Sequence, residues 1–523
     1  MPLLELVGVC KRFGAVAALT DITLDVERGE VHCLLGENGA GKSTLCNLIF
    51  GVHRPDAGRI AFGGTIFAPE GPADALRQGI GMVHQHFSLV GTMTVVENLM
   101  MGRTGPILDA SQVVARMKRL ADEYKLEIDP WRVVRELSVG ERQQVEIIKC
   151  LLGDPKLLVL DEPTAVLPPG EVDSFLAVCR RVADDGRAVI LVTHKLAEIA
   201  KVADRTTVLR QGTVIETVPM AGADMRALVR SMIGHEIQSG GGVLAATLGL
   251  ADAPAEDRAP PVPQPAAAAA AATGTPALEL KGVSYRDAGG VTRLDEVSLK
   301  VRPGEVVGIA GVEGNGQSEL GAILAGLARA SEGSIVVDGT DLTAAAPKDI
   351  TACGVGIVPE DRHAVAVVSE LSIAENMFLG ATRRFSRFGL LDRAAMRKAA
   401  TALMREFDVR ASHADAPMSS LSGGNQQKAV LARELTLSPL KLLLAAQPTR
   451  GLDVSAVEAV YGRIQAARDK GLGVLLISSE LNELIAVSDR VAVMYRGRIV
   501  GEMEASAANR EAIGSMMSGH AHE

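Results

Sequence analysis

The sequence predicts a duplicated α/β fold, in which two similar domains each have a mainly parallel sheet core with helices on both faces. Three observations lead to this prediction. The chain of 523 residues is too long for one hydrophobic core. Its two halves repeat each other, and each half alternates apolar, strand-like runs with helical stretches. That alternation is typical of a parallel sheet covered by helices.

The repeat is visible when the two halves are aligned. Residues 18–45, ALTDITLDVERGEVHCLLGENGAGKSTL, match residues 293–320, RLDEVSLKVRPGEVVGIAGVEGNGQSEL, and Gly36 meets Gly311 at an offset of 275. His194 meets Ser479 at an offset of 285. Because the offset drifts so little over this span, the chain is predicted to be a duplicated domain with small insertions.

A segment of different composition separates the halves. Residues 240–276, GGGVLAATLGLADAPAEDRAPPVPQPAAAAAAATGTP, are dominated by small residues and proline and carry little charge. Such a segment cannot bury a core and indicates a flexible or semi-rigid linker. The expected domains are therefore residues 1–239, with intact motifs, and residues 277–523, in which several motif residues are replaced.

Bulk composition narrows the class of protein. The net charge of −9 argues against nucleic acid as the main partner. The six cysteines are scattered without a CxxC pair, which is typical of a reducing compartment. No apolar run reaches the roughly 18 residues of a spanning helix. We expect a cytosolic chain that can dock on a membrane protein and binds no nucleic acid.

The segment GENGAGKST (residues 36–44) fits the pattern G-x-x-x-x-G-K-[ST] between an apolar strand and a helical stretch. Such a loop closes backbone N–H groups around phosphate oxygens, and the following helix directs its positive end at the same anion. Lys42 would place a positive charge near the β- and γ-phosphates, and the Ser43 hydroxyl would ligate Mg²⁺. Nucleotide contacts are expected from Gly36, Glu37, Asn38, Gly39, Ala40, Gly41, Lys42, Ser43 and Thr44.

Four polar residues that follow apolar runs complete this predicted site. Asp161 and Glu162 end the run LLVLDE: Asp161 would hold Mg²⁺, directly or through water, and Glu162 would orient and polarise the attacking water. Gln85, in GMVHQHF, would sense Mg²⁺ or water, and His194, in AVILVTHKL, would reach the γ-phosphate. The predicted ligands are ATP and Mg²⁺. Glu162, His194 and Gln85 are the candidate catalytic residues, and Ser43, Gln85 and Asp161 the candidate metal ligands.

Each half also begins an amphipathic helix with serine and glycine, in LSVGERQQ from Leu137 and in LSGGNQQK from Leu421. A helix N-terminus favours an anion. The order P-loop, glutamine, LSGGQ-like signature, strand-Asp-Glu-Pro and histidine resembles the nucleotide-binding domain of ABC ATPases, twice over and across nearly the whole chain outside the linker. The resemblance implies two P-loop NTPase domains of the ABC type in tandem, each with a helical subdomain, packed head to tail.

Within that family, a fused tandem with a degenerate second half resembles the ATP-binding subunits of bacterial sugar and nucleoside importers. The strings GVEGNGQSEL and AAQPTRGLD look closest to the nucleoside (purine) branch, and a monosaccharide importer is the alternative. The resemblance implies a peripheral ATPase at the cytoplasmic face of the inner membrane. It would serve two transmembrane permease subunits, identical or different, and indirectly an extracytoplasmic substrate-binding protein.

A soluble tandem ABC ATPase acting on ribosomes or DNA is the rival hypothesis. Proteins of that class usually keep both sites intact and carry charged helical linkers, whereas this chain has a Pro/Ala-rich linker and one damaged site.

Head-to-tail packing would sort the intact and the replaced residues into separate sites. The first P-loop would receive its trans residues from the second half, where all fit their motifs: Ser422, Gly423, Gly424, Gln426 and Asp453. The other site would hold Gln317 for lysine, Glu360 for glutamine, Ala446 and Gln447 for Asp-Glu, Ser479 for histidine, and Val139 and Pro168 on its trans side. We therefore predict one catalytic site per chain.

The positions of two aromatic residues are also predicted. The resemblance implies that Phe13, in CKRFG, stacks on adenine, with core packing as the alternative. Residues 86–136 would be the helical subdomain that touches the membrane subunit in relatives, and Trp131 within it is expected in the core.

Overall fold

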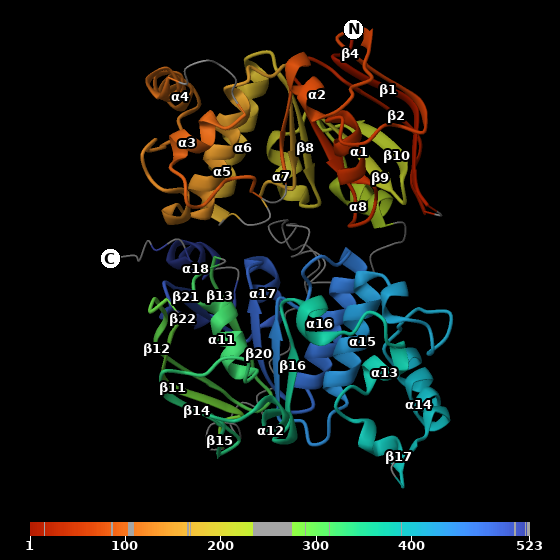
Figure 1. The fold of residues 1–523 in the computed structure, drawn as a ribbon, viewed down its shortest axis with the longest axis vertical. Helices are drawn as coiled ribbons and strands as arrows, with labels where there is room; N and C mark the ends of the chain where they lie inside the picture. Colours follow the sequence, from red (N-terminus) through yellow and green to blue (C-terminus); the bar gives the residue numbers. More distant parts are fainter. Residues whose placement is uncertain are drawn as a thin grey trace. The chain divides into compact units, whose positions relative to one another are not determined.

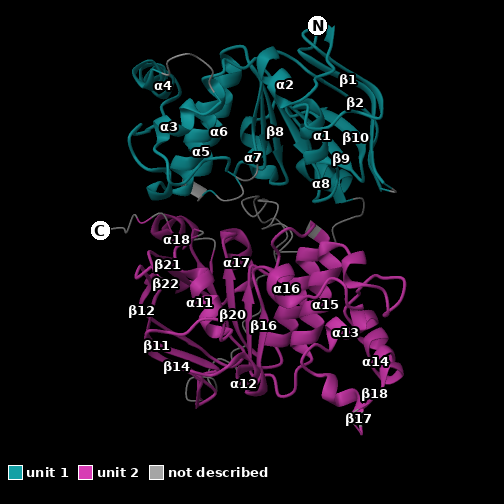
Figure 2. Ribbon diagram, in the orientation of Figure 1, with its two compact units in different colours: residues 1–239, 248–250 teal, residues 240–247, 251–523 magenta. Residues whose placement is uncertain are grey.

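The computed structural model separates into two compact units, one of residues 1–239 and 248–250 and the other of residues 240–247 and 251–523 (Figure 2). The structure describes residues 1–14, 16–84, 87–102, 109–164, 167, 169–233, 275–287, 289–312, 314–388, 390–506, 509–517 and 519. The predicted linker, apart from Thr275 and Pro276, lies outside the described residues, and so do Gln85 and Pro168.

The first unit is built on a six-stranded sheet with the order β10-β9-β3-β8-β7-β6. Figure 1 labels its strands β8, β9 and β10. Its central strands are buried along their whole length and pair in parallel, and β10 at the edge runs antiparallel. Unbroken apolar runs are expected for strands covered on both faces, so the predicted mainly parallel core is confirmed. The strands are β3 (Val31–Leu35), β6 (Ile80–Val83), β7 (Leu157–Asp161), β8 (Ala188–Thr193), β9 (Arg205–Arg210) and β10 (Thr213–Pro219).

A second, antiparallel sheet of four strands lies in the same unit, and the sequence patterns did not predict it as a separate sheet. Its order is β2-β1-β4-β5. Helix α1 (Lys42–Ile49) joins both sheets in one hydrophobic cluster, because Leu45, Leu48 and Ile49 pack with apolar residues of each. The strands are β1 (Leu4–Phe13), β2 (Val16–Val26), β4 (Ala57–Phe62) and β5 (Thr65–Ile66).

The segment between β6 and β7 carries α3, α4, η1 and α5, in line with the helical subdomain that the resemblance implied. Helix α3 contacts α4 and α5, and both α3 and α5 begin with a capping box, at Thr94 and Ser138 respectively. Trp131 in this segment is 62% exposed, so the expectation that it lies in the core is wrong. The helices of the unit are α2 (Pro72–Gln78), α3 (Val95–Met100), α4 (Ala110–Tyr124), η1 (Val134–Glu136), α5 (Val139–Leu151), α6 (Pro169–Asp184), α7 (Leu196–Val202) and α8 (Met225–Ile233).

The second unit repeats both sheets, with the orders β16-β19-β20-β13-β21-β22 and β12-β11-β14-β15. The two faces of its main sheet are both covered. Leu442 and Leu444 of β19 pack in one hydrophobic cluster, and Leu443 and Ala445 pack in another. The strands are β11 (Leu278–Arg286), β12 (Thr292–Val301), β13 (Val306–Ala310), β14 (Glu332–Val337), β15 (Thr340–Asp341), β16 (Val355–Val358), β17 (Ser386–Arg387), β18 (Leu390–Leu391), β19 (Leu442–Ala446), β20 (Gly473–Ser478), β21 (Arg490–Tyr495) and β22 (Arg498–Glu504).

The helices of the second unit follow the same plan as those of the first. A helical segment again lies between β16 and β19 and ends in α15, the helix that carries the second LSGG motif. The helices are α11 (Gln317–Leu324), α12 (Pro347–Ala352), η3 (Arg362–Ala366), α13 (Ile373–Met377), η4 (Thr382–Phe385), α14 (Arg393–Glu406), η5 (Met418–Ser420), α15 (Gly423–Leu435), α16 (Val454–Arg468), α17 (Leu481–Val487) and α18 (Arg510–Met517).

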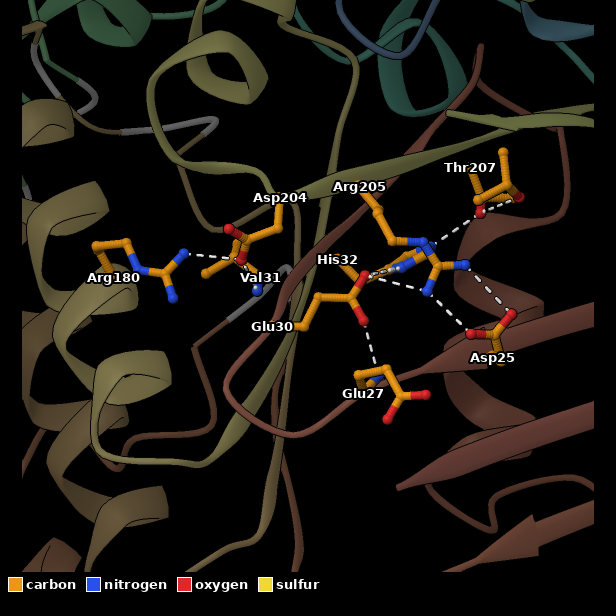
Figure 3. Close-up of polar contacts among 10 residues, drawn as sticks. Asp25, Glu27, Glu30, Val31, His32, Arg180, Asp204, Arg205 and Thr207 are labelled. Carbon is orange, nitrogen blue, oxygen red and sulfur yellow. Dashed lines mark hydrogen bonds and ion pairs between the residues drawn. The ribbon is translucent and has the colours of Figure 1, made fainter. Parts of the chain in front are cut away.

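A polar network fixes the start of β3, the strand that leads into the first P-loop (Figure 3). His32 is fully buried, with Nδ1 2.9 Å from Glu30 Oε1 and Nε2 2.8 Å from Thr207 Oγ1. Arg205 donates two hydrogen bonds to Asp25, which hold the pKa of that carboxyl below its usual value. The network ties β3 to β2 and β9. It therefore fixes the position of the strand that leads into the P-loop.

Candidate functional site

The first P-loop connects β3 to α1 and depends on two glycines for its path. Residues Gly36 to Gly41 form the loop, and Lys42, Ser43 and Thr44 begin α1. A Cβ on Gly36 would lie 2.5 Å from the carbonyl oxygen of Leu209, so the loop passes close to β9. Gly41 has a φ of +102°, and a Cβ there would lie 2.8 Å from the carbonyl oxygen of Ala18. Only glycine fits both positions without moving backbone.

Lys42 is buried inside the loop, with 5% of its surface exposed. Its Nζ donates hydrogen bonds to the carbonyl oxygens of Gly36 at 2.7 Å and Glu37 at 3.0 Å. The same nitrogen lies 3.8 Å from Oε1 of Glu162. Burial lowers the pKa of Lys42, and the charges of Glu162 and Asp161 oppose that shift. The loop therefore holds a cation beside the two carboxylates that follow β7.

Asp161 ends β7 next to the first turn of α1. Burial raises the pKa of this carboxyl, and a hydrogen bond donated by the Ser43 hydroxyl opposes the rise. Its Oδ1 is buried and has no hydrogen-bond partner in the described part of the chain. A buried carboxylate oxygen without a partner, beside a hydroxyl, matches the oxygen ligands that Mg²⁺ prefers.

Glu162 follows Asp161 in a left-handed backbone conformation, with φ of +47°, and its N–H donates to the carbonyl oxygen of Val192 at 3.1 Å. That turn directs its side chain to His194, whose Nδ1 lies 3.7 Å from Glu162 Oε1. Burial raises the pKa of Glu162, but His194 and the charge of Lys42 outweigh it, and the net pKa lies below the usual value. The carboxylate is thus ionised at neutral pH, as a general base requires.

Phe13 lies at the end of β1 and is 44% exposed, so it is not part of the core. Its ring packs edge-on against His53, with centroids 5.1 Å apart, and Lys11 Nζ lies 5.7 Å from its centroid. An exposed ring of this kind can present a face to an aromatic base. The predicted adenine contact stays a prediction.

At the described residues the second P-loop resembles the first, with Gly316 at a φ of +110° against +102° for Gly41, but its lysine is replaced. Gln317 stands at the position of Lys42, and its Nε2 donates to the carbonyl oxygen of Val312 at 3.2 Å. Gln447 repeats the turn of Glu162, with φ of +46° and its N–H on the carbonyl oxygen of Ile477 at 2.7 Å. Its Oε1 accepts from the N–H of Ser479 at 3.3 Å. The scaffold is preserved while the ammonium, the base and the histidine are absent from it.

An ion pair that the sequence analysis did not predict lies beside this second P-loop. The Ser318 hydroxyl, at the position of Ser43, donates to Glu360 Oε2 at 2.8 Å. Glu360 Oε1 accepts from Arg450 Nη1 at 2.7 Å. Glu360 was singled out as a replaced glutamine, but Arg450 was missed. The signal was present in PTRGLD, where an arginine replaces the alanine of PTAVLP.

The second signature starts helix α15, and Ser422 is its N-cap residue. The Ser422 side chain accepts a hydrogen bond from the N–H of Asn425 at 3.5 Å. Gly424 packs against α16, since a Cβ there would lie 3.0 Å from Cβ of Ala456, and Gly423 lies beside the guanidinium of Arg362. The N-terminal end of α15 therefore offers backbone N–H groups next to small side chains.

Two further predicted residues hold this region in shape. Gln426 is buried, and its Nε2 donates to the carbonyl oxygens of Met418 at 3.2 Å and Leu421 at 3.3 Å, which fixes the turn before α15. Asp453 is the N-cap of α16 and accepts from the N–H of Ala456 at 2.8 Å. Their predicted nucleotide contacts stay predictions.

Comparison with known proteins agrees with this geometry. The family model described as "ABC transporter" matches residues 19–165 and 294–450. The chain is 39% identical to the nucleoside import ATP-binding protein NupA of Lactococcus lactis, covering 99% of this chain and 98% of that protein. It is 42% identical to the glucose import ATP-binding protein TsgD13 of Haloferax volcanii, covering 99% and 96%. It is 38% identical to the guanosine import ATP-binding protein NupO of Bacillus subtilis, covering 99% and 97%.

Both halves of the chain match the family model, and the relatives are matched over almost their full length. The tandem identification made from the motifs is confirmed. The chain belongs to the ABC transporter family of ATP-binding proteins, and it is an ATPase with two such cassettes in one polypeptide.

Proposed function

We propose that this chain is the ATP-hydrolysing subunit of an importer and that one of its two P-loops carries the catalysis. The observation that carries the proposal is the convergence of Lys42, Asp161, Glu162 and His194 at the first P-loop. The corresponding positions of the second unit hold Gln317, Ala446, Gln447 and Ser479. None of those four replacements carries an ionisable group of the kind the first site uses.

The first site is proposed to hold Mg²⁺ with the nucleotide. Ser43 and the buried Asp161 Oδ1 are oxygen donors beside the loop, and Gln85, which lies outside the described residues, is the third proposed ligand. A divalent ion held there would offset the negative charge of the phosphates.

The protein groups have separate proposed roles in hydrolysis. Lys42 holds the β- and γ-phosphates with its ammonium group in a desolvated loop, where electrostatic interactions are strong. Glu162 orients the attacking water and accepts its proton, since its carboxylate is ionised at neutral pH. His194, 3.7 Å from Glu162, orients that base and reaches the γ-phosphate.

The catalytic site is proposed to be composite, with the first P-loop completed by Ser422, Gly423, Gly424 and Asp453 of the second half. The support is that pairing across the halves separates the intact motif residues from the replaced ones. Within one half, an intact P-loop would join a damaged signature, because Val139 stands where the second signature has Gly423. Pairing across halves combines intact elements with intact elements.

The proposed partners are two transmembrane permease subunits. Each unit exposes apolar side chains in the segment between two strands of its main sheet, β6 and β7 in the first unit and β16 and β19 in the second. In the first unit Thr94 and Val133 form an isolated β-bridge that brings two loop segments together. In the second unit Ser372 and Pro417 do the same. Exposed apolar side chains near these bridges are Val90, Met93, Met101 and Trp131 in the first unit, and Val365, Val368, Leu371 and Leu379 in the second.

These side chains lie close together in sequence, and exposed apolar side chains that gather on one face are typical of protein contact sites. Among the described residues, no helix combines the length and the apolar character that crossing a lipid bilayer requires. The import function printed for the relatives supports a proposed location on the cytoplasmic face of the inner membrane, with permease chains between this subunit and an extracytoplasmic binding protein.

A nucleoside is the proposed cargo class. Two of the three relatives named above are described as importers of a nucleoside or of guanosine. A monosaccharide is the second candidate, because the glucose import protein is 42% identical over almost the whole chain.

Reconstitution tests the proposal. The chain is reconstituted in proteoliposomes with the permease and binding proteins encoded beside it. ATP hydrolysis is then measured with guanosine, ribose or glucose on the side of the binding protein. We expect stimulation by guanosine and none in the Glu162→Gln chain. Stimulation by a sugar alone would select the second candidate. Ribosome co-sedimentation without membrane association would contradict the importer proposal altogether.

A further inference from the structure

We propose that a short hairpin of the second unit contacts the surface of a lipid bilayer with negatively charged headgroups. The contact is made by two arginines, Arg383 and Arg384, and two apolar side chains, Phe388 and Leu390, which together are called the hairpin surface. Gly389 and the side chain of Arg387 lie outside the part of the chain that the structure describes and are not included in it. The proposal rests on the proposed function only in placing a membrane beside this segment.

The hairpin is fixed to the core of the second unit from one side. Its strands β17 and β18 pair antiparallel, and the N–H of Asp392 donates to the carbonyl oxygen of Phe385 at 2.7 Å. The ring of Phe385 packs edge-on against Phe378, with centroids 4.7 Å apart, and Leu391 packs against the same hydrophobic cluster. Figure 2 shows both strands at a tip of the second unit, past α14. The hairpin is therefore a projection that the core holds in place.

The opposite side of the hairpin exposes apolar side chains. Successive residues of a strand point to opposite faces, so Leu390 faces outward where Leu391 faces the core. Leu390 is 77% exposed, and Phe388, in the turn, is 92% exposed. Two large apolar side chains left in water side by side are unfavourable, so their position indicates contact with another surface.

The charge of this region is opposite to that of the whole chain. The chain has a net charge of −9, but residues 381–398 contain six basic residues and one acid, Asp392. The Asp392 carboxylate caps α14 and accepts a hydrogen bond from the N–H of Ala395 at 2.9 Å. The segment therefore carries a local positive charge on a negatively charged protein.

Two of the basic side chains beside the hairpin are available to a charged partner. Acids from outside the segment pair with two basic residues of α14, in the pairs Arg393–Glu375 and Arg397–Asp415. Arg383 and Arg384 are exposed on η4, and neither forms an ion pair with a residue that the structure describes. Their guanidinium groups complement the phosphate of an anionic headgroup.

The size of the hairpin surface favours a lipid headgroup layer over a protein as its partner. A stable protein interface buries about 800 Å² on each side, which is more than two apolar side chains provide. A headgroup layer requires no matching shape: it attracts basic side chains, and apolar side chains beside them gain by entering the boundary with the acyl chains. The hairpin also begins within a few residues of Leu379, one of the side chains proposed above to meet the permease. A membrane would therefore lie near it.

Binding of the full chain to vesicles without permease tests the proposal. Vesicles of phosphatidylcholine alone are compared with vesicles in which about a quarter of the lipid is phosphatidylglycerol, and the bound fraction is measured by sedimentation. We expect the chain to bind the anionic vesicles at least about fivefold more tightly, and high salt to weaken that binding.

Variants of the hairpin surface separate the contributions of charge and apolar contact. Arg383→Ser with Arg384→Ser should weaken binding to the anionic vesicles by about 10-fold or more and remove the preference for them. Phe388→Ser with Leu390→Ser should weaken binding by about 10-fold or more while the salt dependence remains. The unfolding temperature should stay nearly unchanged in both, because all four side chains are exposed.

The matched control is Leu327→Ser with Arg329→Ser, which changes an exposed leucine and an exposed arginine elsewhere in the same unit and should leave binding intact. Binding to neither kind of vesicle, equal binding to both, or unchanged binding in the hairpin variants would overturn the proposal. If the hairpin variants lost co-purification with the permease while the unaltered chain bound no vesicles, the surface would contact the permease instead. Because the vesicles contain no permease, these results are independent of ATP hydrolysis in the reconstituted importer, which tests the proposed function.

Discussion

Nζ of Lys42 lies 3.8 Å from Oε1 of Glu162, and the equivalent residues of the second unit, Gln317 and Gln447, are both neutral amides. The backbone around the two pairs is the same, since Glu162 and Gln447 share a left-handed φ of +47° and +46°. The difference between the cassettes is therefore chemical rather than architectural.

Exchanging a carboxylate and an amide at Glu162 and at Gln447 should change ATP hydrolysis through the first cassette only. Glu162→Gln removes the general base, and we expect steady-state ATP hydrolysis to fall by about 10²-fold or more. Gln447→Glu adds a carboxylate where no lysine or Mg²⁺ ligand accompanies it, and we expect less than a twofold change. Phosphate release by the permease-bound chain measures both. Substantial turnover by the Glu162 variant would contradict the assignment.

The buried carboxylate of Asp161 should make the nucleotide-free protein less stable. Burial raises its pKa, and a carboxyl whose folded-state pKa lies above the unfolded value destabilises the fold above those pH values and not below them. Asp161→Asn should therefore raise the unfolding temperature at pH 7, by about 2–4 °C for each kcal/mol gained. The gain should shrink as the pH falls toward the carboxyl's pKa.

The second unit offers the matched control for that measurement. Ala446→Asp places a carboxylate at the equivalent buried position, and calorimetry should show a lower unfolding temperature. If Asp161→Asn destabilised the nucleotide-free chain instead, the carboxylate would be a stabilising group there and our account of its pKa would be wrong.

Phe13 should affect nucleotide affinity more than the chemical step. Its ring is 44% exposed at the end of β1, and an aromatic stacking contact is worth about 0.5–1.5 kcal/mol. We expect Phe13→Ala to raise KM for ATP by about 2- to 12-fold with kcat nearly unchanged, and Phe13→Tyr to behave like the unaltered chain. A loss confined to kcat would exclude a stacking role.

Trp131 should matter for assembly rather than for folding. It is 62% exposed, so Trp131→Ser should leave the unfolding temperature nearly unchanged, while association with the permease weakens by about 10-fold or more, as for an interface hot spot. Co-purification from detergent-solubilised membranes measures this. Ile66→Ser, an 80% exposed position on β5, is the control and should leave association intact.

The sequence was sufficient for the repeated α/β plan, because strands such as β7 and β8 are unbroken apolar runs that only a sheet covered on both faces accommodates. It was also sufficient for the convergence at the first P-loop. Asp161 and His194 follow parallel strands whose carboxyl ends meet at one edge of the sheet.

Other features could not be predicted from local pattern. Trp131 was expected in the core, but its burial depends on how the loop around the Thr94–Val133 bridge packs. The Glu360–Arg450 pair joins residues 90 positions apart, and a single arginine in a turn gives no local sign of its partner. Long-range ion pairs of this kind require the fold.

The most direct test of a composite catalytic site compares the two signature serines. Ser138 and Ser422 cap equivalent helices, α5 and α15, so Ser138→Arg and Ser422→Arg remove the same cap and add the same charge. Steady-state ATP hydrolysis is measured for both, with the unfolding temperature as a check that each is folded. We predict that Ser422→Arg loses hydrolysis and that Ser138→Arg retains most of it. Loss in Ser138→Arg with activity kept in Ser422→Arg would show that the first P-loop works with its own signature, and would contradict the account.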